Sequence, residues 1–205
     1  MRNARSMERA VYIVTDVECD GPTPGRNSML AFASVAVTTA GEPSGVFEAV
    51  LEPLPAGQRD PQTWTWWLSR PDALAAATRD PRPPTEVMVE FAEWVQGFDA
   101  GRVFTAFPLA FDGGWIDFYL RRFTPHALVA GHYADDPLFD GPGLCLKSYA
   151  AGITGQEPWR CTPSTLPPAW FGEHEHTHRA IEDALGYASL LATLMRLRSE
   201  RSIQA

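Results

Sequence analysis

The sequence has few cysteines, no long apolar run and a deficit of basic residues. Its three cysteines, Cys19, Cys145 and Cys161, are widely spaced and odd in number, which argues against a disulfide framework and favours a reducing cytoplasm. No apolar run approaches the roughly 20 residues of a membrane span. Lysine and arginine number 17 against 25 acidic residues, a formal charge of −8. Proteins that grip long nucleic acid through its phosphates usually carry a basic excess, so any such role here must be local.

The length and composition fit one globular domain. At 205 residues with 45% hydrophobic content, the chain can form one substantial core and is too short for two ordinary ones. Residues 1–9 are interpreted as a loose arm, and residues 10–200 as the single domain. The arm is basic but is followed by strand-like sequence, so a secretory signal is not expected.

Periodicity predicts strands first and then an alternation of strands and helices. Three strands are predicted to form a meander, at Val11–Val17, Met29–Thr39 and Val46–Leu51. Two more strands are predicted at Arg102–Phe107 and around Ala127–His132. Helices are predicted at Pro71–Thr78, Thr85–Phe98, Trp115–Phe123, Leu144–Ala151 and His178–Arg198. This order predicts an α/β fold with a mixed five-stranded sheet, a meander followed by parallel strands, flanked by helices on both faces.

Two acidic residues lie at the end of the first predicted strand. Asp16 and Glu18 share one face because side chains alternate along a strand, and this face is otherwise apolar. Two carboxylates so close repel each other, so one must take up a proton or a cation must lie between them. The alternative is that the strand ends at Asp16 and both acids point into water. Asp20 falls in the following turn and is expected to be solvated.

Asp112 follows the fourth predicted strand, at the mouth of a helix. An aspartate in this position is often an N-cap, and that structural role is the main alternative to a functional one. Asp117 lies five residues further along the helix and is expected on the surface.

The last helix contains an aspartate that does not fit its polar stripe. At about 100° per residue, Asp183 lies in line with Tyr187, Leu190 and Leu194 rather than with the polar residues. Burying an unpaired carboxylate is costly, and no lysine or arginine lies one turn away. Asp183 therefore needs a partner, such as a cation.

The stretch "HEHTHRAIEDA" contains two competing patterns. His174, Glu175 and His178 match H-E-x-x-H, but a zinc protease needs both histidines on a formed helix, and helical periodicity begins only near His178. His178 and Asp183 match H-x(4)-D, with the histidine at the helix entry and the aspartate one turn inside. A movable imidazole beside a fixed carboxylate suits a general base next to a metal site. The alternative is that His178, like His174 and His176, is a solvated loop residue.

Taken together, these residues resemble the DEDDh family of 3′→5′ exonucleases, which have an RNase H-like fold. Asp16 and Glu18 in "TDVECDG" match the first motif, Asp-x-Glu at the end of the first strand. Asp112 in "AFD" matches the second motif. His178 and Asp183 in "HRAIEDA" match the third, His-x(4)-Asp. The motifs occur in the family's order and span most of the chain.

The resemblance implies a two-metal mechanism. Two divalent cations, Mg²⁺ or Mn²⁺, would lie among Asp16, Glu18, Asp112 and Asp183, with Asp16 bridging both. His178 would accept the proton of the water that attacks the terminal phosphodiester. The products would be nucleoside 5′-monophosphates.

Aromatic residues provide candidate contacts for the substrate. "WTWWLSRPDA" is similar to a tryptophan-pair segment of bacterial exoribonucleases in this superfamily. Trp64, Trp66 and Trp67 are candidates for stacking on bases, although tryptophans more often pack a loop onto a sheet, as is expected for at least one of these. Phe111 is a further candidate for substrate binding. Pro108 departs from the family, which often has asparagine four residues before the second-motif aspartate, and this affects the expected substrate contacts.

The sequence therefore predicts a metal-dependent 3′→5′ exonuclease acting on single-stranded or 3′-overhanging nucleic acid, with a lean towards RNA. Its partners would be RNA or DNA 3′ ends and not a membrane, and homodimerisation is left open. The alternatives are a module that binds 3′ ends with little or no turnover and, third, an H-E-x-x-H zinc protease.

Overall fold

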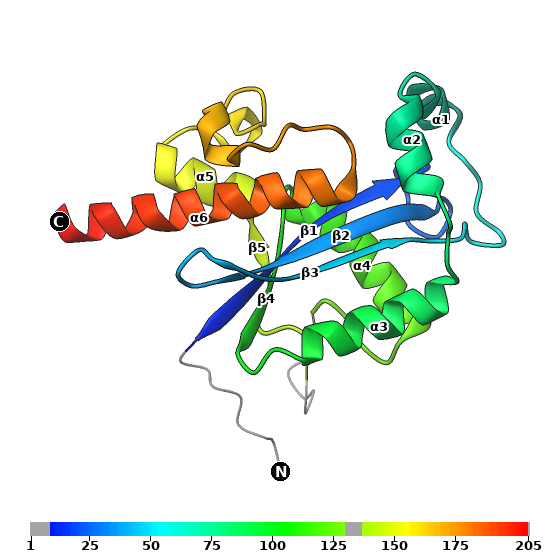
Figure 1. The fold of residues 1–205 in the computed structure, drawn as a ribbon, viewed down its shortest axis with the longest axis horizontal. Coiled ribbons are helices and arrows are strands. Elements are labelled where there is room, and N and C mark those ends of the chain that lie inside the picture. The colour runs from blue at the N-terminus through cyan, green and yellow to red at the C-terminus, as the bar shows by residue number, and fades with distance from the viewer. Residues whose placement is uncertain (1–8, 130–136, 205) are drawn as a thin grey trace, which may run out of the picture.

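A five-stranded mixed sheet forms the centre of the molecule (Figure 1). The computed structural model describes residues 9–129 and 137–204. The strands lie in the order β3-β2-β1-β4-β5. β1, β2 and β3 form an antiparallel meander, while β4 pairs parallel to β1 and β5 parallel to β4. Their bounds are Ala10–Cys19 (β1), Met29–Thr38 (β2), Pro43–Val50 (β3), Gly101–Ala106 (β4) and Leu144–Cys145 (β5). The predicted α/β architecture is confirmed.

Helices cover both faces of the sheet. Figure 1 shows α3 and α4 on one side and α5 and α6 on the other. The helices are α1 (Pro61–Leu68), α2 (Pro71–Thr78), α3 (Pro84–Gln96), α4 (Leu109–Phe123), α5 (Leu146–Thr154) and α6 (Ala180–Gln204), with short 3₁₀ helices η1 (Pro158–Arg160) and η2 (Pro168–Phe171). Across the described ranges, no helix is both long and apolar enough to cross a bilayer.

β1 is buried on both faces because its apolar residues alternate between two hydrophobic clusters. Val11, Ile13 and Val17 pack with side chains of α3 and α4, whereas Val14 packs with side chains of α5 and α6. The even-numbered residues therefore face α6. This alternation directs the acidic end of β1 towards the last helix.

α1 and α2 lie near the C-terminal end of β1 (Figure 1). A third hydrophobic cluster joins Trp67 of α1 and Ala73 and Ala77 of α2 to Leu30 and Ala31 of β2. The sequence analysis did not predict α1. Its first turn is closed by Asp60, whose side chain accepts a hydrogen bond from the backbone N–H of Thr63 at 2.8 Å, in the manner of an N-cap.

The predicted fifth strand was misplaced. Residues 127–129 of that range are not strand, and its remaining residues lie outside the described part of the chain. The fifth strand is instead β5, only two residues long, which pairs with Thr105 and Ala106 of β4. An alternation of two residues is too short to be recognised as a periodic pattern.

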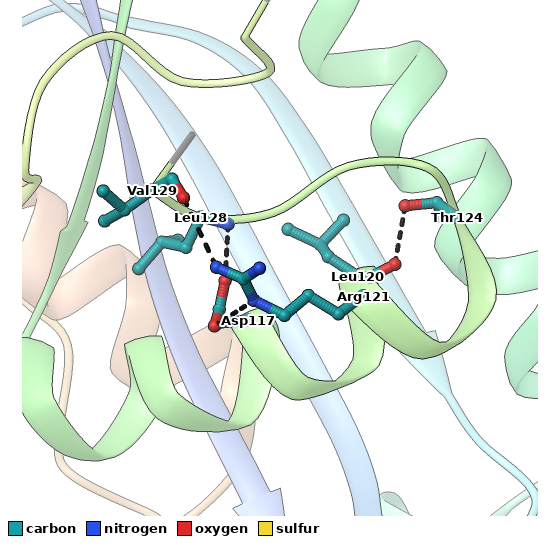
Figure 2. Close-up of polar contacts among 6 residues, drawn as sticks. All are labelled: Asp117, Leu120, Arg121, Thr124, Leu128 and Val129. Atoms are coloured by element: carbon teal, nitrogen blue, oxygen red, sulfur yellow. Dashed lines mark hydrogen bonds and ion pairs between the residues drawn. The ribbon is translucent and has the colours of Figure 1, made fainter. Parts of the chain in front are cut away.

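α4 begins six residues earlier than predicted, at Leu109 rather than Trp115. Its C-terminal half is linked to the chain that follows it, as Figure 2 shows: Asp117 accepts a hydrogen bond from the Leu128 N–H at 2.7 Å and pairs with Arg121 at 2.7 Å. Asp117 is therefore a partly exposed structural residue, in line with its expected surface position.

Candidate active site

Three carboxylates from β1 and α6 converge at the acidic end of β1. Asp16 and Glu18 lie on the β1 face that packs against α6, and Asp183 lies in the first turn of that helix. One carboxylate oxygen from each of the three lies within 4.8 Å of the others. All three residues are buried, with 7%, 8% and 3% of their surfaces exposed respectively. Residues about 165 positions apart thus form one cluster, as the sequence motifs predict.

Asp112 lies next to this cluster, at the start of the helix that follows the fourth strand. β1 and β4 are parallel neighbours with Thr15 opposite Ala106, so the chain that leaves β4 enters α4 next to Asp16. Asp112 is buried in the first turn of α4, where Pro108 rather than Asp112 occupies the N-cap position. Its Oδ2 atom is buried and has no hydrogen-bond partner among the residues that the structure describes. The N-cap alternative is therefore wrong, because Asp112 lies inside the first turn of α4, and its carboxylate is close enough to Asp16 to raise the pKa of that residue.

The electrostatics of the cluster are unfavourable for four bare carboxylates. Burial raises the pKa of Asp16 well above its usual range, and the neighbouring Glu18, Asp112 and Asp183 raise it further. Burial also raises the pKa of Glu18, again with Asp183 and Asp112 adding to the effect. The pKa of Asp112 is raised by burial to about 8, although the backbone N–H groups of Phe107 and Val17 oppose the shift. The cluster therefore requires protons or cations to balance its charge.

The donor set fits hard divalent cations. Mg²⁺ and Mn²⁺ prefer oxygen ligands, and the cluster consists of carboxylate oxygens alone. The unsatisfied Oδ2 of Asp112 is an acceptor still in need of a positive partner. Burial alone would favour protonation, but cations held between these oxygens would reverse that preference and keep the carboxylates ionised.

His178 lies beside the cluster in the loop before α6. Its φ is 59°, in the left-handed region, and α6 begins two residues later at Ala180. The half-buried imidazole packs edge to face against Trp66, with ring centroids 4.8 Å apart. Burial lowers the pKa of His178, and the adjacent His176 lowers it further, while Asp183 opposes the shift. The predicted placement of His178 at the helix entry, with Asp183 inside the helix, is confirmed.

This loop excludes the geometry of a zinc protease. Residues 174–178 are not helical, so His174 and His178 are not placed one helical turn apart on one face. Among the described residues, metal-ligand groupings include His178 but not His174 or Glu175.

His176 also contacts the cluster, which the sequence did not predict. It was treated as a solvated loop histidine, yet its Nδ1 atom lies 2.8 Å from Oδ2 of Asp183. The backbone N–H of Thr177 donates to Oδ1 of the same carboxylate at 3.0 Å. The partner that Asp183 requires is thus supplied from the preceding loop. The H-x-H spacing of His176 and His178 was the available signal, because alternate residues of an extended segment can face a common side.

The tryptophans of α1 have different roles. Trp67 is buried and its indole N–H donates to the Cys19 carbonyl at 2.9 Å, which ties α1 to the end of β1. Trp66 packs edge to face against Trp67 at 4.9 Å between ring centroids, also contacts His178, and has the guanidinium of Arg70 over its ring at 4.2 Å. Trp64 is partly buried beneath the guanidinium of Arg59, at 3.7 Å. At least one of the three therefore packs the fold, as expected.

The structure also places Asp20 and Phe111, two other residues singled out in the sequence. Asp20 was expected to be solvated, but it is buried with 1% exposure and accepts a hydrogen bond from the Ser28 N–H at 2.6 Å. This hydrogen bond closes the connection between β1 and β2. The turn-like sequence around Asp20 did not indicate that its side chain is buried. Phe111, a candidate for substrate binding, is 40% exposed and directly precedes Asp112.

Comparisons with known proteins agree with this geometry. No protein-family model matches the chain. It is 28% identical over 204 residues to the 3′-5′ DNA exonuclease Cap18 of Escherichia coli, covering 96% of this chain and 97% of that protein. The fold resembles the nuclease domain of 3′hExo, a DEDDh family member bound to rAMP, with a TM-score of 0.66 at 9% identity and 93% of each chain covered. It also resembles E. coli exonuclease I in complex with a dT13 oligonucleotide, with a TM-score of 0.67 at 15% identity over 95% of this chain and 43% of that one.

The sheet order, the sequence order of the acidic motifs and the full-length likeness to a curated exonuclease lead to one assignment. The chain has the RNase H-like fold of the DEDDh exonucleases and is similar over almost its whole length to a 3′→5′ exonuclease.

Proposed function

We propose that this chain removes nucleotides one at a time from single-stranded or 3′-overhanging ends and releases nucleoside 5′-monophosphates. The observation that carries the proposal is the convergence of Asp16, Glu18 and Asp183 within 4.8 Å, next to the buried Asp112. The residues between 10 and 200 act as a single domain in this proposal. The three cysteines are free thiols, which fits a reducing cytoplasm.

DNA is the proposed substrate, because the curated relative that matches almost the whole chain is a DNA exonuclease. The lean towards RNA drawn from the tryptophan segment is not tested by these likenesses. The solved neighbours include one bound to rAMP and one bound to dT13, so the fold alone does not separate the two substrates.

Asp16, Glu18, Asp112 and Asp183 are proposed to hold two divalent cations, Mg²⁺ or Mn²⁺. Such ions would activate the attacking water and neutralise charge that develops on the phosphate and the leaving oxygen. The buried position of the four carboxylates keeps them fixed, so little reorganisation is needed as the reaction proceeds. The cations also supply local positive charge in a protein whose net charge is −8.

His178 is proposed as the general base. A pKa lowered by burial leaves the imidazole neutral near pH 7, which is the form that can accept a proton from the attacking water. The edge of Trp66 against its ring limits the orientations of the imidazole. In the resting geometry the neighbouring loop is anchored to Asp183 through the Thr177 N–H, so the base stays near the carboxylates.

A labelled oligonucleotide tests the proposal directly. We expect a 5′-labelled single-stranded DNA oligomer to shorten stepwise from its 3′ end with Mg²⁺ or Mn²⁺, and to stay intact with EDTA. An RNA oligomer of the same sequence gives the substrate preference from the ratio of the two rates. Binding of the oligomer without shortening in either metal would instead select the 3′-end binding module. Cleavage of a peptide substrate that depends on Zn²⁺ would select the protease.

Trp66 is proposed to stack on a base near the 3′ end. Stacking on an aromatic side chain contributes about 1–3 kcal/mol per base, so we expect Trp66→Ala to weaken oligonucleotide binding by about 5- to 150-fold. The affinity is best measured in an Asp16→Asn background, where turnover does not consume the ligand. Trp159→Ala is the matched control, since Trp159 is 70% exposed and lies in η1. Unchanged affinity with an unchanged melting temperature would remove Trp66 from the binding surface.

A further inference from the structure

A second group of metal-binding side chains adjoins the carboxylate cluster. His176, His178 and Asp183 each offer one ligand atom, and these three atoms lie within 4.8 Å of one another. The group shares Asp183 with the carboxylate cluster but differs from it in chemistry, since two of its three donors are imidazole nitrogens. The proposed exonuclease reaction uses His178 and Asp183, and it gives His176 no role.

The loop before α6 brings the two imidazoles together. Thr177 anchors its centre, because its N–H donates to Oδ1 of Asp183 at 3.0 Å and its hydroxyl donates to Glu182. His178 then adopts a φ of 59°, which a residue with a side chain rarely does. The result is that the rings of His176 and His178 meet edge to face, with centroids 4.4 Å apart. Strained backbone of this kind is retained where surrounding contacts or function require it.

The three residues also differ in accessibility in a way that suits capture of an ion from solution. The side chain of Asp183 is 1% exposed and forms the floor, whereas that of His176 is 39% exposed and lies at the mouth. Nδ1 of His176 is already 2.8 Å from Oδ2 of Asp183, so two of the donors are close without any rearrangement. An ion bound by all three donors would lie about 2.0–2.2 Å from each, the usual range for zinc, so the three ligand atoms, which lie within 4.8 Å of one another, would close around it.

The donor set selects a different metal from the carboxylate cluster. Two imidazole nitrogens and one carboxylate oxygen are typical ligands of Zn²⁺, and three protein ligands leave a fourth tetrahedral position for water or a substrate oxygen. Mg²⁺ prefers oxygen ligands in octahedral geometry and binds imidazole poorly. A site of this composition therefore discriminates between the two ions through its nitrogen donors.

We propose that His176, His178 and Asp183 form a binding site for Zn²⁺ that competes with the catalytic cations and inhibits the enzyme. An ion bound there would be coordinated by His178, which could then no longer accept a proton. It would also coordinate Asp183, which would then no longer be available to the catalytic cations. The inhibition rests on the proposed exonuclease function, but the binding itself does not. The site uses His176 rather than His174, so it is distinct from the H-E-x-x-H pattern of the sequence.

Zinc affinity can be measured by competition with a chromogenic zinc chelator in the presence of excess Mg²⁺. We expect one zinc ion per chain and a loss of affinity of about tenfold or more in His176→Asn. The matched control is His174→Asn, a histidine of the same loop that lies outside the grouped ligands. We expect its zinc affinity to stay within about twofold of the wild type, because it removes no ligand. Circular dichroism checks that both variants are folded.

Three outcomes would overturn the site: no zinc binding in excess Mg²⁺, equal binding by wild type and His176→Asn, or a loss confined to His174→Asn. Replacing Zn²⁺ with Co²⁺ provides a spectroscopic readout, since a tetrahedral site with two nitrogen donors gives visible absorption that His176→Asn should abolish. Zinc inhibition of oligonucleotide shortening, expressed as the ratio of rates with and without zinc, should weaken in the same variant. Because the titration does not depend on turnover, an inactive protein that still binds zinc through His176 would refute the proposed function and leave the site intact.

Discussion

Replacement of Asp16 by asparagine is expected to lower the exonuclease rate by at least about a thousandfold while the protein stays folded. Asp16 is the carboxylate on which Glu18, Asp112 and Asp183 all act, so it occupies the centre of the cluster. Asparagine has nearly the same shape but carries no charge, and it offers one oxygen instead of two. The change therefore removes cation binding with little effect on packing.

The same variant is expected to be more heat-stable than the wild type in EDTA. Burial and repulsion raise the pKa of Asp16 in the folded state above that of the unfolded chain. An acid shifted in this direction destabilises the fold once the pH exceeds its unfolded value, and asparagine removes that penalty. We expect the melting temperature at neutral pH to rise by about 2 °C or more, and the stabilisation by Mg²⁺ to be reduced or lost.

Asp99→Asn serves as the control for both measurements. Asp99 is exposed and precedes the N-terminal end of β4, whereas the cluster lies at the C-terminal end of the parallel strand β1. Its substitution should leave the rate, the melting temperature and the response to Mg²⁺ unchanged. If Asp16→Asn kept most of the wild-type rate, the assignment of the carboxylate cluster as the catalytic centre would be refuted.

Replacement of His178 by asparagine is expected to lower kcat by about 10²- to 10⁴-fold, the usual contribution of a general base. Stabilisation by Mg²⁺ should persist, because the four carboxylates remain in place. This combination separates His178 from Asp16, whose loss should abolish both properties. His174→Asn is the matched control in the same loop, and it should retain the wild-type rate.

The pH dependence gives an independent test of the same residue. The proposed base acts in its neutral form, and burial together with His176 lowers its pKa. The rate of the wild type should therefore hold as the pH falls through 6.5, the ordinary histidine value, and decline only below it. The acidic limb should disappear from the residual activity of His178→Asn. A limb that persists unchanged in that variant would assign the titration to another group.

The sequence predicts those parts of the site that depend on regular periodicity. Alternation along β1 places Asp16 and Glu18 on one face, and the apolar run before them indicates that this face is buried. Asp183 was recognised because it lies off the polar stripe of α6. Both inferences use only the geometry of a single strand or helix, which a linear sequence encodes directly.

The features that were missed depend on contacts between distant segments. β5 is a two-residue strand defined by its pairing with β4, and no local pattern identifies it. α1 lies in a stretch rich in proline and tryptophan, which shows no clear helical periodicity. The helix is stabilised by the burial of Trp67 against β2 rather than by strong intrinsic propensity. The role of His176 follows from the path of a loop with an unusual backbone at His178. Such turns are set by tertiary contacts.

The adjacent tryptophans of α1 impose a constraint on variation in this region. Trp67 fastens the helix to the carbonyl of Cys19, and its neighbour Trp66 supports the ring of His178, so this eight-residue helix bridges the acidic end of β1 and the loop before α6. Inserting or deleting a single position between Asp60 and Trp66 would turn both indoles by about 100° around the helix axis relative to the capped first turn, so Trp66 could no longer meet the ring of His178. Length changes should therefore be tolerated in the connections on either side of α1 and rejected within it.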